Sequence, residues 1–506
     1  MFEKIMKTID GILGFFKPAK GAAENPISRM DTYEEFALNV TGTLLREDDL
    51  GVTSAVRSLK LSGDTYENLL HMYHSDAIDI EAVNRRWIEA VDAQGVAYHL
   101  QSEKDLPEDE KRAVLVGDHK KTAKEARHQA GVERLHQESE TQTKGETIWG
   151  HCCGCVSMLA GNDEKGCVCI PLIMDIEHGL NALAGWIGSR INPESMIQRM
   201  YRNITRAADA LGKSVLFLCD TAFLSKDGLR MLDEYNKTHE GKEIQVLTRC
   251  KGMIAAYEPP KEEEGTRRGR KRKKGDRVSL WEAFSSMKES FKARTIMLYG
   301  RKQEVKALAV NLLWGKGYYK RMRFILVVLE SGARSILATT DLSMDPFEAV
   351  ALYGRRFRIE NAFRELSQVY SAFKYRFWTK ACPRTNHFSS SNEPDPLESI
   401  VDEGQRKKIL DNVNAIELYM LVCCIAMGID QIIGLTLDLD RDSFRWQRTP
   451  AKEIPSEANV AYVLREAFKS SVKYGFFDCE SLTLQIIRKA QGFKKKKRSW
   501  KKETAA

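Results

Sequence analysis

The sequence predicts a mixed α/β core with a β-rich insertion, flanked by N- and C-terminal helical regions. Three observations predict it: apolar residues at helical spacing up to about residue 110, an abrupt change to β-rich runs, and strands alternating with helical patterns up to residue 250. The chain has 506 residues, of which 43% are hydrophobic and 29% charged. This composition is typical of a globular protein of roughly three domains.

The first region, residues 1–110, is expected to be helical and to bind DNA, although a partner chain would suit it equally. Its apolar residues recur at spacings of three and four, and Gly and Asp turn signals separate the segments. The expected helices cover residues 33–45, 55–61, 66–73 and 79–91.

The core begins with residues 111–250, where two strands end at aspartates. The first strand ends at Asp118 and the fourth at Asp220. Because of this order, both carboxylates could lie side by side at strand ends. The expected strands cover residues 113–117, 147–159, 166–176, 214–219 and 244–248, and the expected helices residues 193–211 and 226–237.

The rest of the chain divides into three parts. Residues 251–320 form the β-rich insertion with a basic loop, and residues 321–382 the second part of the core, with two strands and a helix over residues 346–369. Residues 383–506 form a C-terminal helical region with a basic tail, expected to serve oligomerisation or DNA contact.

The positive charge is concentrated in two short stretches. Residues 261–277 hold nine Lys or Arg and four Asp or Glu, and residues 494–503 hold seven and one. Since the net charge of the whole chain is +8, the remainder is slightly acidic. Two basic stretches on an otherwise nearly neutral chain favour a polyanionic partner. The alternative interpretation is that they are a solvated loop and a solvated tail.

No membrane span or export signal is expected. The longest uncharged apolar run in a helical segment, residues 418–429, has 12 residues, whereas a span needs about 20. Eleven cysteines without framework spacing indicate a reducing compartment, and we expect the cytoplasm.

The aspartates suggest phosphodiester chemistry. Two Mg²⁺ ions about 4 Å apart can activate an oxygen nucleophile and stabilise the leaving oxygen, and carboxylates are their natural ligands. Asp118 and Asp220 together favour a ribonuclease-H-like site, whereas either one alone is more typical of a turn or cap.

A third carboxylate lies on the helix expected after the sheet. At about 100° per residue, Tyr353, Arg356, Glu360 and Arg364 share one face. Glu360 could therefore bind a metal while the cations bind phosphates. A surface helix with salt bridges one turn apart is the alternative.

These residues carry a family resemblance. Tyr353-x2-Arg356-x3-Glu360 resembles the Y-x2-R-x3-E-x6-K signature of bacterial insertion-sequence DDE transposases, the YREK-signature group with a ribonuclease-H-like core. The match continues, in the right order, over about residues 110–380. Its other segments are residues 116–122, 218–223, 247–251, 338–342 and 372–378.

The resemblance implies a catalytic triad of Asp118, Asp220 and Glu360, which ligates two Mg²⁺ ions, with Mn²⁺ able to substitute. Water attacks the phosphodiester at each element end, and the freed 3′-OH then attacks target DNA. The partners would be double-stranded DNA and further copies of the chain, in a dimer or larger synaptic complex. It implies no membrane, no small-molecule substrate and a bacterial, nucleoid-associated location.

One position departs from the signature. Ser367 stands where the family has Lys, and Arg364 or Lys374 could supply the missing cation. Lys374 and Arg376 alternate with aromatics, as on a DNA-backbone track or on an amphipathic edge strand. The residues expected to contact DNA are Tyr353, Arg356, Arg364, Lys374, Arg376, Arg270, Lys271, Arg272, Lys273 and Lys274.

A DNA transposase is therefore the leading hypothesis. Two alternatives remain open: a metal-dependent nuclease of the same fold that does not join strands, and a DNA-binding protein without catalysis. Trp281 and Trp314 lie in the insertion, where an aromatic side chain could stack on a flipped base, although most Trp residues belong to the core.

Overall fold

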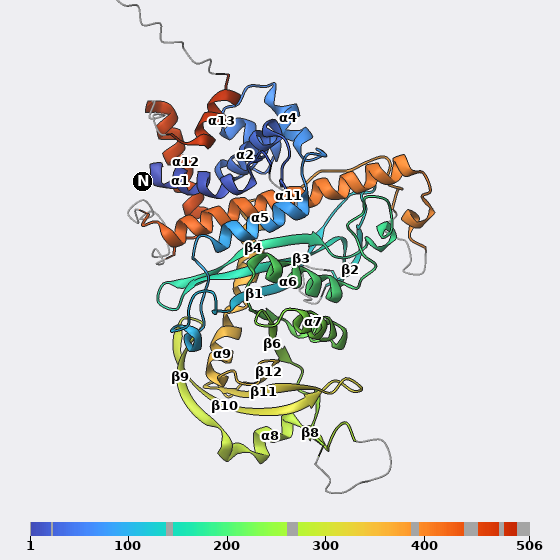
Figure 1. Ribbon diagram of the computed structural model, residues 1–506, viewed down its shortest axis with the longest axis vertical. Coiled ribbons are helices and arrows are strands. Elements are labelled where there is room, and N and C mark those ends of the chain that lie inside the picture. Colours follow the sequence, from blue (N-terminus) through green and yellow to red (C-terminus); the bar gives the residue numbers. More distant parts are fainter. Residues whose placement is uncertain are drawn as a thin grey trace, which may run out of the picture.

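The fold is mixed α/β, with a 12-stranded mixed sheet running through the molecule and helices packed around it (Figure 1). The computed structural model describes residues 2–21, 24–137, 145–260, 272–385, 394–439, 454–474 and 480–492.

The first half of the sheet contains both antiparallel and parallel strands. β1 pairs with β3 in antiparallel and with β5 in parallel orientation, and β5 pairs with β6 in parallel. The far edge of β3 is covered by β2 and β4. The strands are β1 (Ala113–Ala123), β2 (Glu133–His136), β3 (Thr147–Asn162), β4 (Gly166–Ile176), β5 (Val215–Cys219) and β6 (Ile244–Cys250).

The second half continues from β6 without interruption. β12 pairs with β6, β11 with β12 and β10 with β11, all antiparallel, so the strands of the expected insertion extend the core sheet. The strands are β7 (Ala255–Tyr257), β8 (Arg277–Ser279), β9 (Lys292–Leu298), β10 (Arg301–Trp314), β11 (Lys320–Leu329) and β12 (Arg334–Thr339).

Helices cover the sheet and connect its strands. Ser195 caps α6 with a reciprocal capping box, and Gly212 in the left-handed region ends it. Asp345 caps α9, which has Pro at its first position. These helices are α6 (Met196–Leu211), α7 (Lys226–Thr238), α8 (Leu280–Ser286), α9 (Pro346–Arg355) and α10 (Arg358–Gln368).

The N- and C-terminal helices pack together as one layer at the end of the molecule opposite β8–β11 (Figure 1). α2 contacts α11, α12 and α13, and α1 contacts the same three helices. The helices are α1 (Phe2–Leu13), α2 (Met30–Leu45), α3 (Val52–Ser58), α4 (Thr65–Met72), α5 (Ile80–Asp92), α11 (Glu403–Thr436), α12 (Glu457–Tyr474) and α13 (Leu482–Ala490).

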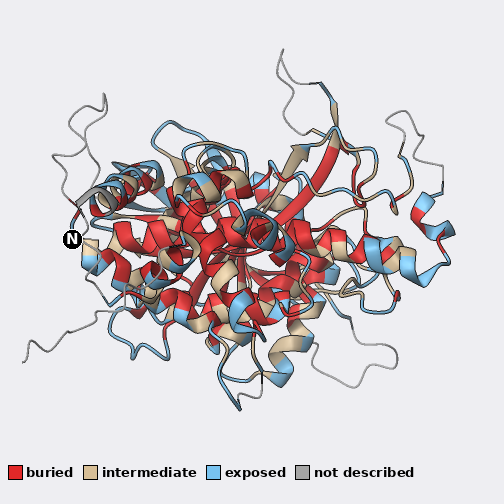
Figure 2. Ribbon diagram, turned by 90° about the horizontal axis from the view of Figure 1, so that it is seen from above, coloured by how far each residue is buried: buried red, intermediate tan, exposed pale blue. Residues whose placement is uncertain are grey.

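α11 is a buried core helix, as its apolar run predicts. It is long and apolar enough to cross a membrane, but 94% of its most apolar window is buried against β4 and the surrounding helices. Such burial is typical of the core helix of a soluble protein. The buried residues are concentrated in the middle of the molecule (Figure 2).

Two expected elements differ from the structure in ways that affect the site. The first strand does not end at Asp118: β1 runs on to Ala123, because Asp118 to Ala123 continue to pair with β3. This part is polar and only half-buried, so the sequence has no apolar signal there. The single helix expected over residues 346–369 is two helices, α9 and α10.

Candidate active site

Asp118 and Asp220 lie on neighbouring parallel strands. Gly117 of β1 is the register partner of Cys219, the last residue of β5, so the two aspartates follow at the same level of the sheet. The His119 amide donates a 2.8 Å hydrogen bond to Asp118 Oδ1, and the Thr221 amide donates one of 2.7 Å to Asp220 Oδ1. Both carboxylates thus have one oxygen held by the following amide.

Arg356 joins this pair to the third carboxylate. Its Nη1 donates to Asp118 Oδ2 at 2.9 Å, and its Nη2 donates to Glu360 Oε1 at 3.3 Å. The side chain of Arg356 is 15% exposed, that of Asp118 22% and that of Glu360 45%. The guanidinium therefore bridges a largely buried acid and a more open one.

The junction of α9 and α10 places these groups on one side. Three successive backbone hydrogen bonds span three residues instead of four: Arg356 N to Tyr353 O, Ile359 N to Arg356 O, and Glu360 N to Phe357 O. This tighter winding replaces the regular helical turn assumed from the sequence. Tyr353 and Glu360 nevertheless both stay close to Arg356, whose guanidinium carbon lies 5.9 Å from the Tyr353 ring centre.

Burial dominates the electrostatics of the site. It raises the pKa of Asp118 above its ordinary value, the Arg356 charge counters the rise, and the Asp220 charge adds to it. Burial also raises the pKa of Tyr353 to about 12, so its hydroxyl stays protonated and can donate a hydrogen bond. The site is a group of interacting acids around one permanent cation.

The donor types in this group fit Mg²⁺, because carboxylate oxygens are the hard ligands that the ion prefers. Their arrangement is not that of an assembled metal centre. Within the described residues, no three His, Cys, Asp or Glu side chains lie together closely enough to hold a metal ion. Arg356 stands between Asp118 and Glu360, so a shared ion requires that the guanidinium first release both acids.

The cations expected beyond Arg356 are paired elsewhere. Arg364 is exposed and forms an ion pair with the adjacent Glu365 at 3.1 Å. Ser367 donates from Oγ to the carbonyl of Phe363 within the helix. Lys374 forms an ion pair with Asp49, in the N-terminal helical region. Neither candidate for the missing signature Lys is therefore hydrogen-bonded to the three carboxylates.

The segment around Lys374 alternates as expected, but it is not a strand. Phe373 and Tyr375 are buried, whereas Lys374 and Arg376 are exposed. The Lys124 Nζ lies 3.4 Å from the Tyr375 ring centre. The aromatic side chains hold this segment on the core, and the two cations face solvent.

The basic loop is described only in part. Arg270 and Lys271 lie outside the described residues. Arg272 and Lys273 are exposed, whereas the Lys274 Nζ packs 3.8 Å from the Tyr257 ring centre. Lys274 therefore anchors the end of the loop on aromatic side chains of the sheet.

A cavity of about 430 Å³ lies beside the site and was not predicted from the sequence. Its lining includes Arg249, Arg277, Arg334 and Trp281, and the Trp281 side chain is 47% exposed. The positive charge of Arg249 opposes the rise in the pKa of Tyr353. These arginines come from β6, β8 and β12, and no local sequence pattern joins them.

Sequence reasoning also gave no role to His119 or Glu177. The two side chains pair with each other next to Asp118, from strands that are far apart in the chain. A histidine directly after the first aspartate was the only available signal.

Compared with protein-family models and with curated proteins, the chain matches none of them.

Proposed function

We propose that the protein is a DNA transposase, which binds the terminal inverted repeats of its element, cuts the DNA ends and joins the 3′-OH ends to target DNA. The observation that carries the proposal is that Arg356 bonds to both Asp118 and Glu360, while Asp220 follows the neighbouring strand at the level of Asp118. These are the residues that the transposase resemblance selects from three distant parts of the chain.

The order of elements supports a ribonuclease-H-like core for this activity. Asp118 lies on β1, and Asp220 directly follows β5, which pairs with β1 in parallel orientation. The third acid comes from a helix pair that packs on the same part of the sheet. Carboxylates from adjacent strands and from a helix packed on them can serve together as ligands of the same metal ions.

In the proposed reaction Asp118, Asp220 and Glu360 hold the metal ions. Mg²⁺, when bound, supplies activation of the attacking oxygen and charge compensation at the leaving oxygen. Arg356 moves from the carboxylates to phosphate oxygens, which a guanidinium can bind with two parallel hydrogen bonds. The protonated Tyr353 hydroxyl donates a hydrogen bond to the same DNA strand.

The cavity around Trp281 suits DNA next to the scissile phosphate. Three guanidinium groups can bind phosphates, and an exposed indole can stack on an unpaired base. Arg364, Lys374 and Arg376 then contact the DNA backbone farther from the reacting atoms. We further propose that the enzyme works as a dimer or larger assembly in the bacterial cytoplasm, because two element ends must be cut and joined together.

The test supplies a duplex that carries the inverted repeats flanking the coding sequence, a supercoiled plasmid target and Mg²⁺. The wild-type protein should cut the duplex and insert its ends into the plasmid, and chelation of Mg²⁺ should stop both reactions. Asp118→Asn, Asp220→Asn and Glu360→Gln should bind the duplex but lose cutting and joining.

Asp227→Asn is a matched control, since Asp227 is an exposed residue of the nearby helix α7. This variant should retain both reactions. Cutting without joining would show a nuclease, and duplex binding without cutting would show a DNA-binding protein. Cutting by the Asp118 or Asp220 variants would contradict the proposed site.

A further inference from the structure

A buried acid and a histidine form a pair on the opposite face of β1 from Asp118. Successive side chains of a strand point to opposite faces, so the His119 side chain lies on the face of β1 opposite to Arg356. Its Nε2 contacts Glu177 Oε2, directly after β4. Glu177 is 2% exposed, and Asn203 of α6 donates to its other oxygen at 3.2 Å.

The fold leaves a defined space for this carboxylate. Gly154 of β3 is the register partner of His119. A Cβ atom at Gly154 would lie 1.9 to 2.3 Å from the carboxylate atoms of Glu177. Any other residue at position 154 would therefore displace the acid. Burying an ionised carboxylate costs several kcal/mol unless it is paired, so the pair with His119 stabilises its presence here.

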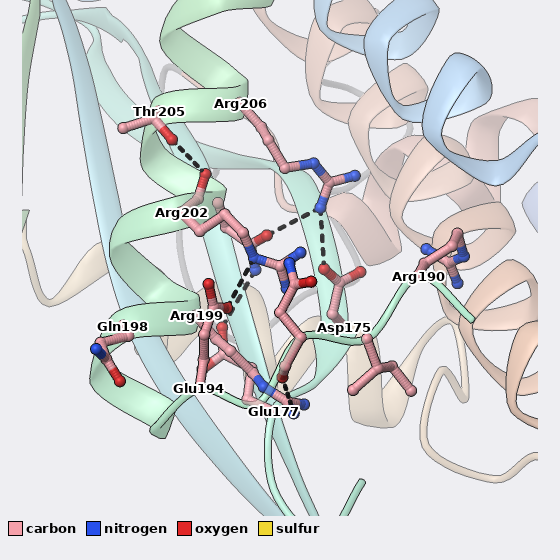
Figure 3. A network of polar contacts seen from close by, with 12 residues as sticks. Asp175, Glu177, Arg190, Glu194, Gln198, Arg199, Arg202, Thr205 and Arg206 are labelled. Atoms are coloured by element: carbon pink, nitrogen blue, oxygen red, sulfur yellow. Dashed lines mark hydrogen bonds and ion pairs between the residues drawn. The ribbon is translucent and has the colours of Figure 1, made fainter. Parts of the chain in front are cut away.

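A network of polar contacts from α6 supports the His119–Glu177 pair. Arg206 donates to Asp175 at 3.3 Å (Figure 3) and to the Asn203 side chain at 2.9 Å. Arg190 pairs with Glu417 of α11. Asn203, which donates to Glu177, is thus itself fixed. The orientation of the Glu177 carboxylate follows from α6 and β4 together.

His119 also connects the two strands that carry the aspartates. Its amide donates to Asp118 Oδ1 at 2.8 Å. Its ring centre lies 4.9 Å from that of Phe223, three residues after Asp220. The Tyr201 hydroxyl donates to the Phe223 carbonyl at 2.9 Å, which fixes that turn on α6. His119 therefore contacts both segments that carry the proposed metal ligands, Asp118 through its backbone amide and Phe223 through its ring.

We propose that His119 is a positioning residue, oriented by Glu177, which fixes the segments of Asp118 and Asp220 relative to each other. The inference rests on the proposed function. His119 touches neither DNA nor metal in this role; it acts through the backbone of β1 and through Phe223. Groups that orient metal ligands in this way typically contribute about 10- to 100-fold to metal affinity.

The experiment measures Mn²⁺ binding to the full chain by electron paramagnetic resonance, alongside thermal unfolding. Glu177→Gln keeps the size of the side chain and removes its charge, and His119→Asn removes the imidazole. Both should weaken Mn²⁺ binding about tenfold or more. His119→Gln, which can still donate to Glu177, should restore most of the affinity.

His178→Asn is the matched control. His178 also pairs with a glutamate, Glu133, but neither residue is bonded to Asp118. This variant should bind Mn²⁺ as the wild type does. A structural role alone would lower the unfolding temperature of the His119 variants without changing Mn²⁺ affinity, and that result would overturn the inference.

Failure of the inference can be distinguished from failure of the proposed function. If the wild type and Asp118→Asn bind Mn²⁺ equally, the proposed metal site is wrong. If Asp118→Asn loses binding while Glu177→Gln retains full affinity, only the positioning role is wrong. Glu177→Gln decides the question if His119→Asn does not fold, because it removes a buried charge and keeps the packing.

Discussion

Arg356 has two roles that compete with each other. In the present arrangement it neutralises Asp118 and Glu360, which stabilises two acids that lie close together. The same contacts oppose a metal ion, because a guanidinium and Mg²⁺ require the same oxygens. Arrival of a phosphate would draw the guanidinium away and free the acids, so DNA and metal would bind cooperatively.

The first prediction concerns this competition. Arg356→Gln should bind Mn²⁺ about tenfold more tightly without DNA, corresponding to about 1.4 kcal/mol, because the competing charge is removed. It should also lose the tightening that DNA brings to the wild type. A titration of Mn²⁺ with and without duplex checks both expectations. Arg230→Gln, an exposed position of α7, should change neither value. Weaker metal binding by Arg356→Gln would contradict the competition.

His151 is a buried residue that links stability to pH. It is 0% exposed, and its ring nitrogens bond to the Tyr375 hydroxyl at 2.6 Å and to the Ala130 carbonyl at 2.8 Å. Burial lowers its pKa to about 4. The folded protein therefore keeps the ring neutral, while the unfolded chain takes up a proton at about pH 6.5.

The second prediction follows from that difference. The free energy of unfolding should fall as the pH drops from about 6.5 to about 4, and His151 should account for about 1.6 kcal/mol of the loss between pH 6.5 and 5. Urea unfolding of the wild type and of His151→Gln at both pH values measures this contribution, since Gln can keep both hydrogen bonds but does not titrate. Equal pH dependence of the two proteins would show that His151 is protonated when folded.

At the scale of elements, the helical layer is joined to the sheet through a close contact of α5 and α11. A Cβ atom at Gly428 of α11 would lie 2.3 and 2.6 Å from atoms of the Trp87 ring. Trp87 on α5 cannot easily move, because its indole donates to the Pro171 carbonyl of β4 at 2.8 Å. The glycine thus sets the distance between two helices and a strand.

The third prediction compares two identical substitutions. Gly428→Ala should destabilise the protein by about 1 to 3 kcal/mol, because the added methyl group overpacks the contact. Gly11→Ala in α1 should stabilise it by about 0.5 to 1 kcal/mol, since that glycine is exposed, has nothing within 4 Å and lies inside a helix. Urea unfolding of both variants tests this, and equal effects would rule out the contact as the cause.

Elements that combine a strong periodicity with a capping or turn signal were the most predictable. α7 begins at Lys226 as expected and β4 has the predicted bounds, because a serine cap and a glycine turn mark their starts. β2, β7 and β8 were missed, since each has only three or four residues and is defined by its neighbour. Pairing between distant segments decides such strands.

At the scale of the whole molecule, the β-rich half and the helical layer lie at opposite ends. β8, which follows the basic loop in the chain, lies at the end opposite the helical layer (Figure 1). A polyanion held by this loop would lie along the β-rich half. In the proposed function this brings DNA to the sheet.

The fourth prediction concerns this loop. Replacing Arg270, Lys271 and Lys273 with Gln should reduce the salt dependence of duplex binding, because fewer counterions are released. The slope of log affinity against log salt should fall by up to about 2.7. Three exposed lysines near α7 serve as a control that should leave the slope unchanged: Lys226, Lys237 and Lys242. An equal change in both variants would indicate a general charge effect.

The sequence by itself determined the order of the longer strands and helices, the buried character of α11 and the selection of Asp118, Asp220 and Glu360 as candidates. Apolar periodicity, turn residues and local motifs record these features within a few neighbouring residues. Only the tertiary structure decided that Arg356 bridges two of the acids, that His119 pairs with Glu177, and that three distant arginines line one cavity. Those contacts depend on strand register and helix packing. The Arg356–Asp118 and His119–Glu177 contacts join residues 238 and 58 positions apart and leave no local pattern in the chain.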